Sequence, residues 1–243
     1  MKSTALIIGA SGGLGSALCQ RWLQEEQIDS VIAVSRNPLS DEKKKSPKVT
    51  HFIHCDYSEA AITDTCKKIN TLTDCITHIC ICNGILHDGV HWPEKRIEEV
   101  NARALQDIFT INSITPLLWL KALVSIVKGK SDCIIAVFSA RIGSIGDNRS
   151  GGWYSYRASK AALNMLLKTA AIEYARRAKN VKLIAFHPGT TDTALSKPFQ
   201  HSVKSENLFT AEFVADHLVE IMKHQAIDGE LSYIDWENKA IVW

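Results

Sequence analysis

The sequence lacks a large net charge. Its 28 Lys and Arg residues nearly balance 26 Asp and Glu residues, and the remaining charge of +2 is spread along the chain. Nucleic acids and anionic membrane surfaces bind strongly basic patches, so we expect neither of them as a partner. The basic run Lys43-Lys44-Lys45 is more typical of a solvated loop tip.

Membrane and export signals are also missing from the sequence. No apolar stretch reaches the roughly 20 residues that a membrane-spanning helix needs. Residues 1–4 lead directly into an apolar strand, so we expect no cleaved signal peptide. These two absences favour a cytoplasmic protein.

The cysteines show neither a disulfide framework nor a metal site. They number seven, which is odd, and most of them lie in apolar runs, as reduced core thiols do. Cys80 and Cys82 lie in a predicted strand, where alternation places their side chains on opposite faces. His87 and His91 are better explained as polar residues of a loop than as metal ligands. We therefore expect no metal.

Strand-like and helix-like segments alternate along the 243 residues. The apolar runs predict strands over 4–8, 31–34, 50–54, 76–82, 133–138 and 181–186. Helices are predicted over 16–24, 59–72, 101–127 (with a kink at Pro116) and 154–178, and a polar loop over 37–48. Short continuous apolar strands that alternate with helices indicate a doubly wound parallel sheet with helices on both faces. With no repeat and no linker, we expect a single α/β domain over residues 1–243.

A glycine-rich turn joins the first strand to the first helix. It reads Gly9-Ala10-Ser11-Gly12-Gly13-Leu14-Gly15. Glycines let the backbone turn sharply and approach a pyrophosphate, which then lies at the helix N-terminus. The spacing is Gly-x-x-x-Gly-x-Gly and not Gly-x-Gly-x-x-Gly, and the alternative is a tight turn without a ligand. We predict dinucleotide contacts from Gly9, Ser11, Gly12, Gly13, Leu14 and Gly15.

The ends of the next strands suggest which dinucleotide binds. The second strand ends in Ser35-Arg36, where an acid would bind a ribose 2′-hydroxyl and an arginine can pair with a 2′-phosphate. This favours NADP(H) over NAD(H), unless Arg36 is only a surface residue. Asp56, followed by Tyr57, would accept from the adenine amino group or cap the next helix. The small pair Asn83-Gly84 lets a cofactor lie close to the backbone.

Tyr156 and Lys160 are four residues apart, so on a helix they lie one turn apart on one face. An ammonium beside a phenol favours the phenolate and lowers its pKa from about 10. A tyrosine in this setting can exchange a proton near neutral pH. The alternative is an accidental spacing on a helix surface.

Taken together, these motifs resemble the short-chain dehydrogenase/reductase family over nearly the whole chain. The resemblance rests on Gly9-x-x-x-Gly13-x-Gly15, Asp56, Asn83-Gly84, Asn112, Tyr156-x-x-x-Lys160 and Pro188-Gly189. Residues 139–160 and the ending 235–243 are similar to the branch that contains the bacterial C-factor cell-signalling protein and the sniffer-type carbonyl reductases. The resemblance implies a Rossmann-type sheet and transfer of hydride between nicotinamide and a small-molecule carbonyl or alcohol.

The resemblance also implies roles for individual residues. Tyr156 would exchange the proton at the substrate oxygen, and Lys160 would bind the nicotinamide ribose. Asn112 would hold a water that links the lysine to solvent, although a helix-interior amide bonded to backbone is the alternative. Residues expected near the nicotinamide and the diphosphate are Pro188, Gly189, Thr191 and Thr193.

One position departs from the family pattern. Most members end the fifth strand with two serines, and the second hydrogen-bonds the substrate carbonyl. Here the pair is Ser139-Ala140, so alanine occupies the expected position. Strand alternation directs Ser139 to the other side unless the strand twists. Ser139 and Ser144 are both candidates for the missing hydroxyl, and if neither serves we expect slow turnover.

Further expectations concern the loops and the assembly. Residues 194–208 correspond to the substrate lid, or else to an ordinary surface connection, and residues 30–48 and 85–93 would contribute to specificity. Trp92 and Trp153 line the pocket or belong to the core. Apolar residues on several faces of 101–127 and 154–178 indicate a homodimer or homotetramer. The alternative function is a C-factor-like signalling protein that binds NAD(P) with little or no turnover.

Overall fold

The computed structural model describes residues 3–37, 48–129 and 131–243. Its centre is a seven-stranded parallel sheet with the strand order β3-β2-β1-β4-β5-β6-β9. The strands are β1 (Thr4–Ile8), β2 (Ser30–Ser35), β3 (Val49–His54), β4 (Ile76–Ile81), β5 (Cys133–Phe138), β6 (Val181–His187) and β9 (Leu231–Asp235). The two-residue strands β7 (Thr190–Thr191) and β8 (Leu208–Phe209) pair separately. The predicted α/β parallel sheet is confirmed.

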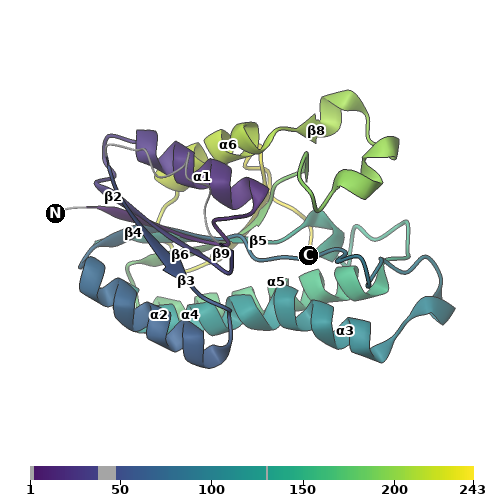
Figure 1. Cartoon of the computed structure of the whole chain (residues 1–243), viewed down its shortest axis with the longest axis horizontal. Coiled ribbons are helices and arrows are strands. Elements are labelled where there is room, and N and C mark those ends of the chain that lie inside the picture. The colour runs from purple at the N-terminus through teal and green to yellow at the C-terminus, as the bar shows by residue number, and fades with distance from the viewer. Residues whose placement is uncertain (1–2, 38–47, 130) are drawn as a thin grey trace.

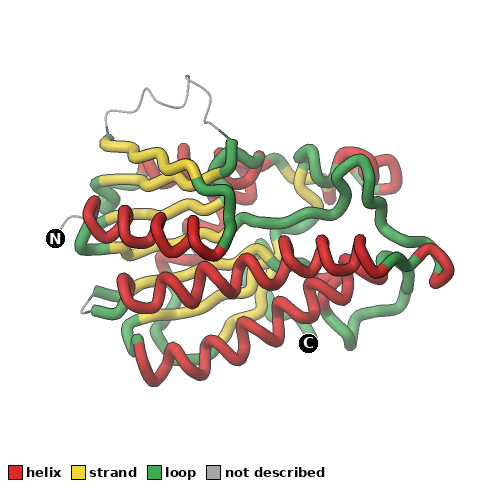
Figure 2. The backbone as a smooth tube through the Cα atoms, turned by 60° about the horizontal axis from the view of Figure 1, so that its bottom comes forward, coloured by secondary structure: helices red, strands yellow, loops and turns green. Residues whose placement is uncertain are grey.

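Helices cover both faces of this sheet (Figure 1). On one face lie α1 (Gly13–Gln24) and α6 (Ala211–Lys223), which contact each other. The other face carries α2 (Glu59–Leu72), α4 (Thr115–Val127) and α5 (Tyr154–Arg177). The tube in Figure 2 shows α5 running beside α4 and its extension α3 (Ala102–Phe109).

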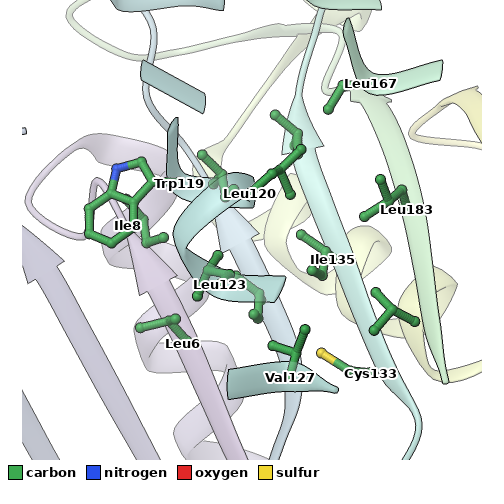
Figure 3. Close-up of a cluster of buried hydrophobic side chains, with 14 of the residues drawn as sticks. Leu6, Ile8, Trp119, Leu120, Leu123, Val127, Cys133, Ile135, Leu167 and Leu183 are labelled. Carbon is green, nitrogen blue, oxygen red and sulfur yellow. The ribbon is translucent and has the colours of Figure 1, made fainter. Parts of the chain in front are cut away.

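Two hydrophobic cores hold these layers together. The first lies between the sheet and the α2–α4–α5 face, where Trp119 and Leu123 pack against Leu6 and Ile135 (Figure 3). The second lies under α1 and α6 and includes the buried ring of Trp22. The strands read as continuous apolar runs because both of their faces are buried.

The predicted helix 101–127 is interrupted. A π-helical turn, η3 (Thr110–Ile114), separates α3 from α4, and Pro116 lies in the first turn of α4. Proline is tolerated there because first-turn N–H groups have no intrahelical partner, so the irregularity lies before the proline.

Contrary to expectation, the segment Ala102–Val127 is long and apolar enough to span a membrane, with a mean hydropathy of 1.4. Trp119, Leu120, Leu123 and Val127 on this segment are buried in the first core. Its apolar composition therefore serves packing on the sheet.

Several elements were not predicted from the sequence. They are α6, β9, the β7–β8 pair and the short 3₁₀ helices η2 (Ile97–Glu99), η4 (Arg141–Gly143), η5 (Lys197–Ser202) and η6 (Ser205–Asn207). Residues 38–47, with most of the predicted polar loop and its basic run, lie outside the described residues.

Candidate active site

The glycine-rich turn brings the backbone of β1 against the start of α1. Gly9 has φ +86°, and its N–H donates to the Val34 carbonyl at 2.9 Å. A Cβ on Gly15 would lie 2.2 Å from the Gly9 oxygen, so only glycine fits there. Gly12 begins the helix without a side-chain cap, which leaves the first N–H groups of α1 available to an anion.

Thr193 closes this turn from the opposite side. A Cβ on Gly13 would lie 3.0 Å from Thr193 Cγ2. Leu14 and Thr193 both line a cavity of about 960 Å³ at the carboxyl end of the sheet. The structure thus brings Thr193 next to the predicted diphosphate site, although Thr193 and Gly13 are 180 positions apart in the sequence.

The ends of β2 and β3 carry the residues expected to contact the adenosine half. Arg36 is exposed, and its guanidinium lies 5.7 Å from the centroid of the Tyr57 ring. Tyr57 itself has φ +70°, a left-handed conformation that is uncommon for tyrosine. The hydroxyl of Ser35 is buried and donates to the Asn37 carbonyl, so Arg36 is the residue of this pair that is free to meet a ligand.

Asp56 takes part in the start of α2. Its carboxylate accepts from the Ser58 N–H at 2.8 Å, and this hydrogen bond holds the pKa of the exposed Asp56 below its usual value. Ser58 in turn caps α2 by accepting from the Ala61 N–H. Asp56 thus holds the backbone of Ser58, and Ser58 is the residue that caps α2. This arrangement is close to the predicted alternative in which Asp56 itself caps the helix.

The end of β4 forms the floor of the cavity. A Cβ on Gly84 would lie 3.6 Å from Lys160 Nζ and 3.7 Å from Asn112 Oδ1. Beside it, Asn83 Oδ1 is buried and has no hydrogen-bond partner within the described chain. A buried polar atom without a partner fits a site that a polar ligand completes.

Tyr156 and Lys160 lie together in the wall of the same cavity. Lys160 Nζ is 5.9 Å from the centroid of the Tyr156 ring and donates to the Phe138 carbonyl at 2.8 Å. Burial lowers the pKa of Lys160 to about 8. Gly143 in η4 permits this close packing, because a Cβ there would lie 2.8 Å from the Lys160 backbone.

The predicted lowering of the tyrosine pKa is not found in this structure. Burial instead raises the pKa of Tyr156 above its usual value of 10. The ammonium of Lys160 hydrogen-bonds to a backbone carbonyl, and loss of hydration disfavours the phenolate. Tyr156 is therefore protonated at neutral pH.

Asn112 joins three segments next to this pair. Its Oδ1 accepts from the Ile85 N–H at 2.7 Å, and its Nδ2 donates to the Ile85 carbonyl at 2.9 Å and to Ser159 Oγ at 3.0 Å. The π-helical turn η3 carries this side chain, which is fully buried. Asn112 thus fixes the loop after β4 against the turn of α5 that bears Lys160.

Both serine candidates have hydrogen-bond partners inside the protein, although Ser139 also borders the cavity. Ser139 Oγ donates to Asn164 Oδ1 at 2.5 Å, and Ser144 Oγ accepts from the Asp147 N–H at 3.1 Å. Ala140 lines the cavity with its methyl group. Twenty-five residues separate Ser139 from Asn164 along the chain, so the sequence pattern could not reveal this contact.

The cavity is also bordered by residues of the segment 194–208, which the sequence predicts as a substrate lid. Phe199 of η5 lines it, as do Leu195, Ser196, Pro198, His201 and Val203, so the predicted lid segment borders the cavity. Glu94 is buried and binds the start of α5 through the Ser155 N–H at 3.1 Å. A glutamate after Trp92-Pro93 carries no sequence signal for such a role.

His187 is another residue of the cavity wall that the sequence did not single out. It ends β6 in the cavity wall directly before Pro188-Gly189, and its Nδ1 is buried without a partner among the described residues. Burial lowers the pKa of His187 to about 4, so the ring is neutral at pH 7. Within the described residues, no group of three or more His, Cys, Asp or Glu side chains is placed to hold a metal ion.

The predicted cofactor residues converge on one edge of the sheet. The cavity is bordered by Leu14, Asn83, Gly84, Tyr156, Lys160, Pro188, Gly189, Thr191 and Thr193. The glycine turn and the unpartnered Asn83 Oδ1 suit a ligand with phosphates and polar edges. The residues present thus fit a nicotinamide dinucleotide.

Comparison with known proteins agrees with this class of site. A family model described as short chain dehydrogenase matches residues 3–204. The chain belongs to the short-chain dehydrogenase family and is an NAD(P)-dependent oxidoreductase.

The chain is similar in sequence to individual proteins of known name. It is 25% identical over 217 residues to benzil reductase ((S)-benzoin forming) of Bacillus cereus, covering 86% of this chain and 84% of that one. It is 33% identical over 123 residues to the C-signal of Myxococcus xanthus, covering 49% and 73% respectively.

Solved structures share the whole fold. The carbonyl reductase Sniffer of D. melanogaster superimposes with a TM-score of 0.86 at 20% identity, and covers 100% of both chains. An NADPH-bound carbonyl reductase from chicken fatty liver gives a TM-score of 0.84 at 21% identity, again over 100% of both chains. At these identities the likeness establishes the fold.

Proposed function

We propose that the protein is an NADP(H)-dependent carbonyl reductase in which Tyr156 is the general acid. The observation that carries this proposal is the position of Tyr156 in the cavity, one turn from Lys160 and above the Gly84 floor. When bound, the cofactor supplies or accepts the hydride. Burial keeps Tyr156 protonated, which suits donation of its proton to a carbonyl oxygen.

The other residues of the site bind and orient. Lys160 presents a buried ammonium to the ribose side of the cavity, and Asn112 fixes the loop that carries Gly84. The glycine turn and Thr193 surround the diphosphate position. Ser139 borders the cavity, but its hydroxyl is hydrogen-bonded to Asn164, and that of Ser144 accepts from Asp147, so we propose that Tyr156 is the main donor to the substrate oxygen.

The proposed cofactor is NADP(H) and not NAD(H), because of Arg36. Its guanidinium is exposed at the end of β2, where a carboxylate would bind a ribose 2′-hydroxyl. The contact with Tyr57 holds the guanidinium beside the adenosine position. An NADPH-bound structure among the similar folds agrees with this choice.

The proposal is tested by following NADPH absorbance with a panel of aldehydes, ketones and diketones. Tyr156→Phe should lower kcat by about a hundredfold or more, because it removes the acid and keeps the ring. Tyr154→Phe is the matched control, since this exposed tyrosine two residues earlier does not line the cavity. Unchanged turnover in Tyr156→Phe would contradict the proposal.

A second candidate function is signalling with bound NAD(P) and little turnover. It is favoured by Ala140 at the usual serine position and by the 33% identity to the C-signal. Complementation of a deletion strain by Tyr156→Phe separates the two. Full complementation favours signalling, and loss of complementation favours catalysis.

We also propose a cytoplasmic homodimer or homotetramer. The seven cysteines, all within the described residues, are not joined in disulfides, and six of them are buried, which suits a reducing compartment. Apolar side chains exposed on α5 and just before α4 (Ile114, Met165 and Ile172) suit a partner surface. Light scattering at micromolar concentration tests the assembly, and a monomer would refute it.

A further inference from the structure

Three aromatic rings from three separate segments form one side of the cavity. Trp92 comes from the loop after β4, Trp153 from the start of α5, and Phe199 from η5. Ring centroids are 5.0 Å apart for Trp153 and Phe199, and 6.1 Å apart for Trp92 and Phe199. We call these three residues the aromatic wall.

The aromatic wall ends at the proton donor. The centroids of Trp153 and Tyr156 are 6.3 Å apart, in an edge-to-face arrangement. At the other end, Trp92 is 53% exposed, so the wall runs from the cavity mouth to the phenol of Tyr156. A ligand that binds along the wall therefore has one end at the reacting group.

A second layer supports the outer part of the wall. The His87 ring stacks on Trp92 with centroids 5.0 Å apart and an interplanar angle of 14°. It also lies 5.7 Å from Phe199, edge to face. The outer rings are thus held by neighbours that do not line the cavity.

The backbone fixes Trp153 in place. Trp153 has φ +54° and ψ +43°, a left-handed conformation that is unfavourable for a bulky side chain. Its N–H donates to the Glu94 carbonyl at 2.5 Å, and the Glu94 carboxylate binds Ser155. The loop that carries Trp92 is therefore tied to the helix that carries Trp153.

Much of the remaining lining near the wall is apolar. The apolar lining includes Leu86, Pro93, Ile142, Leu195, Pro198 and Val203, and Ser196 and His201 add polar groups. Lys95 and Glu99, of opposite charge, also border the cavity and are joined through the Lys95 N–H. The apolar side chains beside the wall favour an uncharged ligand.

We propose that the substrate is an uncharged carbonyl compound with a planar aryl group next to the carbonyl carbon. The aryl ring packs against the aromatic wall while the carbonyl oxygen reaches Tyr156. Aromatic pairs contribute about 0.5–1.5 kcal/mol beyond burial of area, which selects an aryl ring over a saturated ring of the same size. The inference rests on the proposed reductase function, because the bound compound is a substrate only if the protein reduces its carbonyl.

The test compares two diketones that share one skeleton and differ in whether the ring is aromatic or saturated, 1-phenyl-1,2-propanedione and 1-cyclohexyl-1,2-propanedione. Their Kd values are measured by calorimetry on the whole chain, with and without NADP⁺. The expected result is binding of the phenyl compound about 2- to 12-fold more tightly, which corresponds to the aromatic contribution. Equal Kd values, or no binding of either compound, would overturn the inference.

Variants assign the selectivity to the wall. Trp92→Ala and Phe199→Leu should each lower the wild-type ratio of the two Kd values toward one, because each removes an aromatic face. Trp243→Ala is the matched control, since this half-exposed tryptophan packs on Tyr233 and does not line the cavity. Selectivity that survives Trp92→Ala and Phe199→Leu would show that the rings only pack the lid segment.

Turnover, measured as oxidation of NADPH, is followed separately from binding. If the phenyl compound binds selectively but neither diketone oxidises NADPH, the reductase function fails while the aryl site stands. If both diketones are reduced with equal Kd values, the function stands and the aryl site fails.

Discussion

The hydroxyl of Ser139 donates a 2.5 Å hydrogen bond to Oδ1 of Asn164, inside the protein and one helical turn beyond Lys160. Ser139 and its neighbour Ala140 both border the cavity, and Ala140 carries no hydroxyl. A serine that looks catalytic in the sequence thus has a structural contact, and this relationship leads to two predictions.

Ser139→Ala should leave kcat within about twofold and lower the free energy of unfolding. The loss should be about 1–3 kcal/mol, because Asn164 Oδ1 would stay buried without its partner. Steady-state kinetics and denaturant unfolding measure the two effects. A drop in kcat of a hundredfold at unchanged stability would show that Ser139 acts on the substrate.

Ala140→Ser should raise kcat, because it adds a hydroxyl donor at a cavity position next to the reacting carbonyl. A preorganised donor of this kind is typically worth about a hundredfold. Ala140→Cys is the control, as it adds a group of similar size that donates weakly. Equal rates for the two variants would assign any change to volume alone.

The pH dependence of catalysis should follow Lys160. Burial places the pKa of Lys160 at about 8, so its ammonium is lost as the pH rises through that value. We expect kcat/KM to fall above pH 8, because the neutral amine no longer attracts the cofactor ribose and the developing phenolate. Lys160→Arg keeps the charge and should remove this limb of the profile. A wild-type profile that stays flat well above pH 8 would contradict the assigned role.

Arg36→Ala should raise the KM for NADPH by about ten- to a hundredfold, the range expected for a charge-assisted contact with a phosphate. The same variant should change the KM for NADH by less than about threefold, since NADH has no 2′-phosphate. Kinetics with both cofactors on one protein provide the internal control. An equal increase in the KM values for NADPH and NADH would mean that Arg36 contacts a part that the two cofactors share.

Acid should destabilise the protein through buried histidines. The ring of His78 stacks on Trp22 at 4.3 Å, and burial lowers its pKa from 6.5 to about 4. Between these values the unfolded chain binds a proton that the folded chain does not, so the free energy of unfolding falls as the pH falls from 6.5 to 4. The shift corresponds to at most about 3 kcal/mol.

His78→Phe keeps an aromatic ring against Trp22 and removes the titration. Denaturant unfolding at several pH values should show a shallower loss toward acid in this variant. His187, whose pKa is also about 4, lowers the free energy of unfolding toward acid in the same way, and it is still present in the His78→Phe variant. An identical slope in wild type and His78→Phe would exclude His78 as a source of acid sensitivity.

Local sequence patterns were sufficient for much of the fold. The strands Thr4–Ile8 and Cys133–Phe138 and the helix Glu59–Leu72 begin and end at the predicted residues. Such segments are bounded by clear changes in apolar periodicity, and the glycine turn marks the first strand end. The region after residue 187 was harder to predict, because α6 and β9 are stabilised by packing on distant elements.

By itself, the sequence determined the alternating parallel architecture, the glycine turn and the pairing of Tyr156 with Lys160, since each depends on residues close together in the chain. Only the tertiary structure decided that Ser139 binds Asn164, that Asn112 binds Ile85 and Ser159, and that burial raises the pKa of Tyr156. It also decided which rings meet at the cavity, since Trp92, Trp153 and Phe199 come from separate segments. Contacts and desolvation depend on which elements pack together, and a linear pattern does not carry that information.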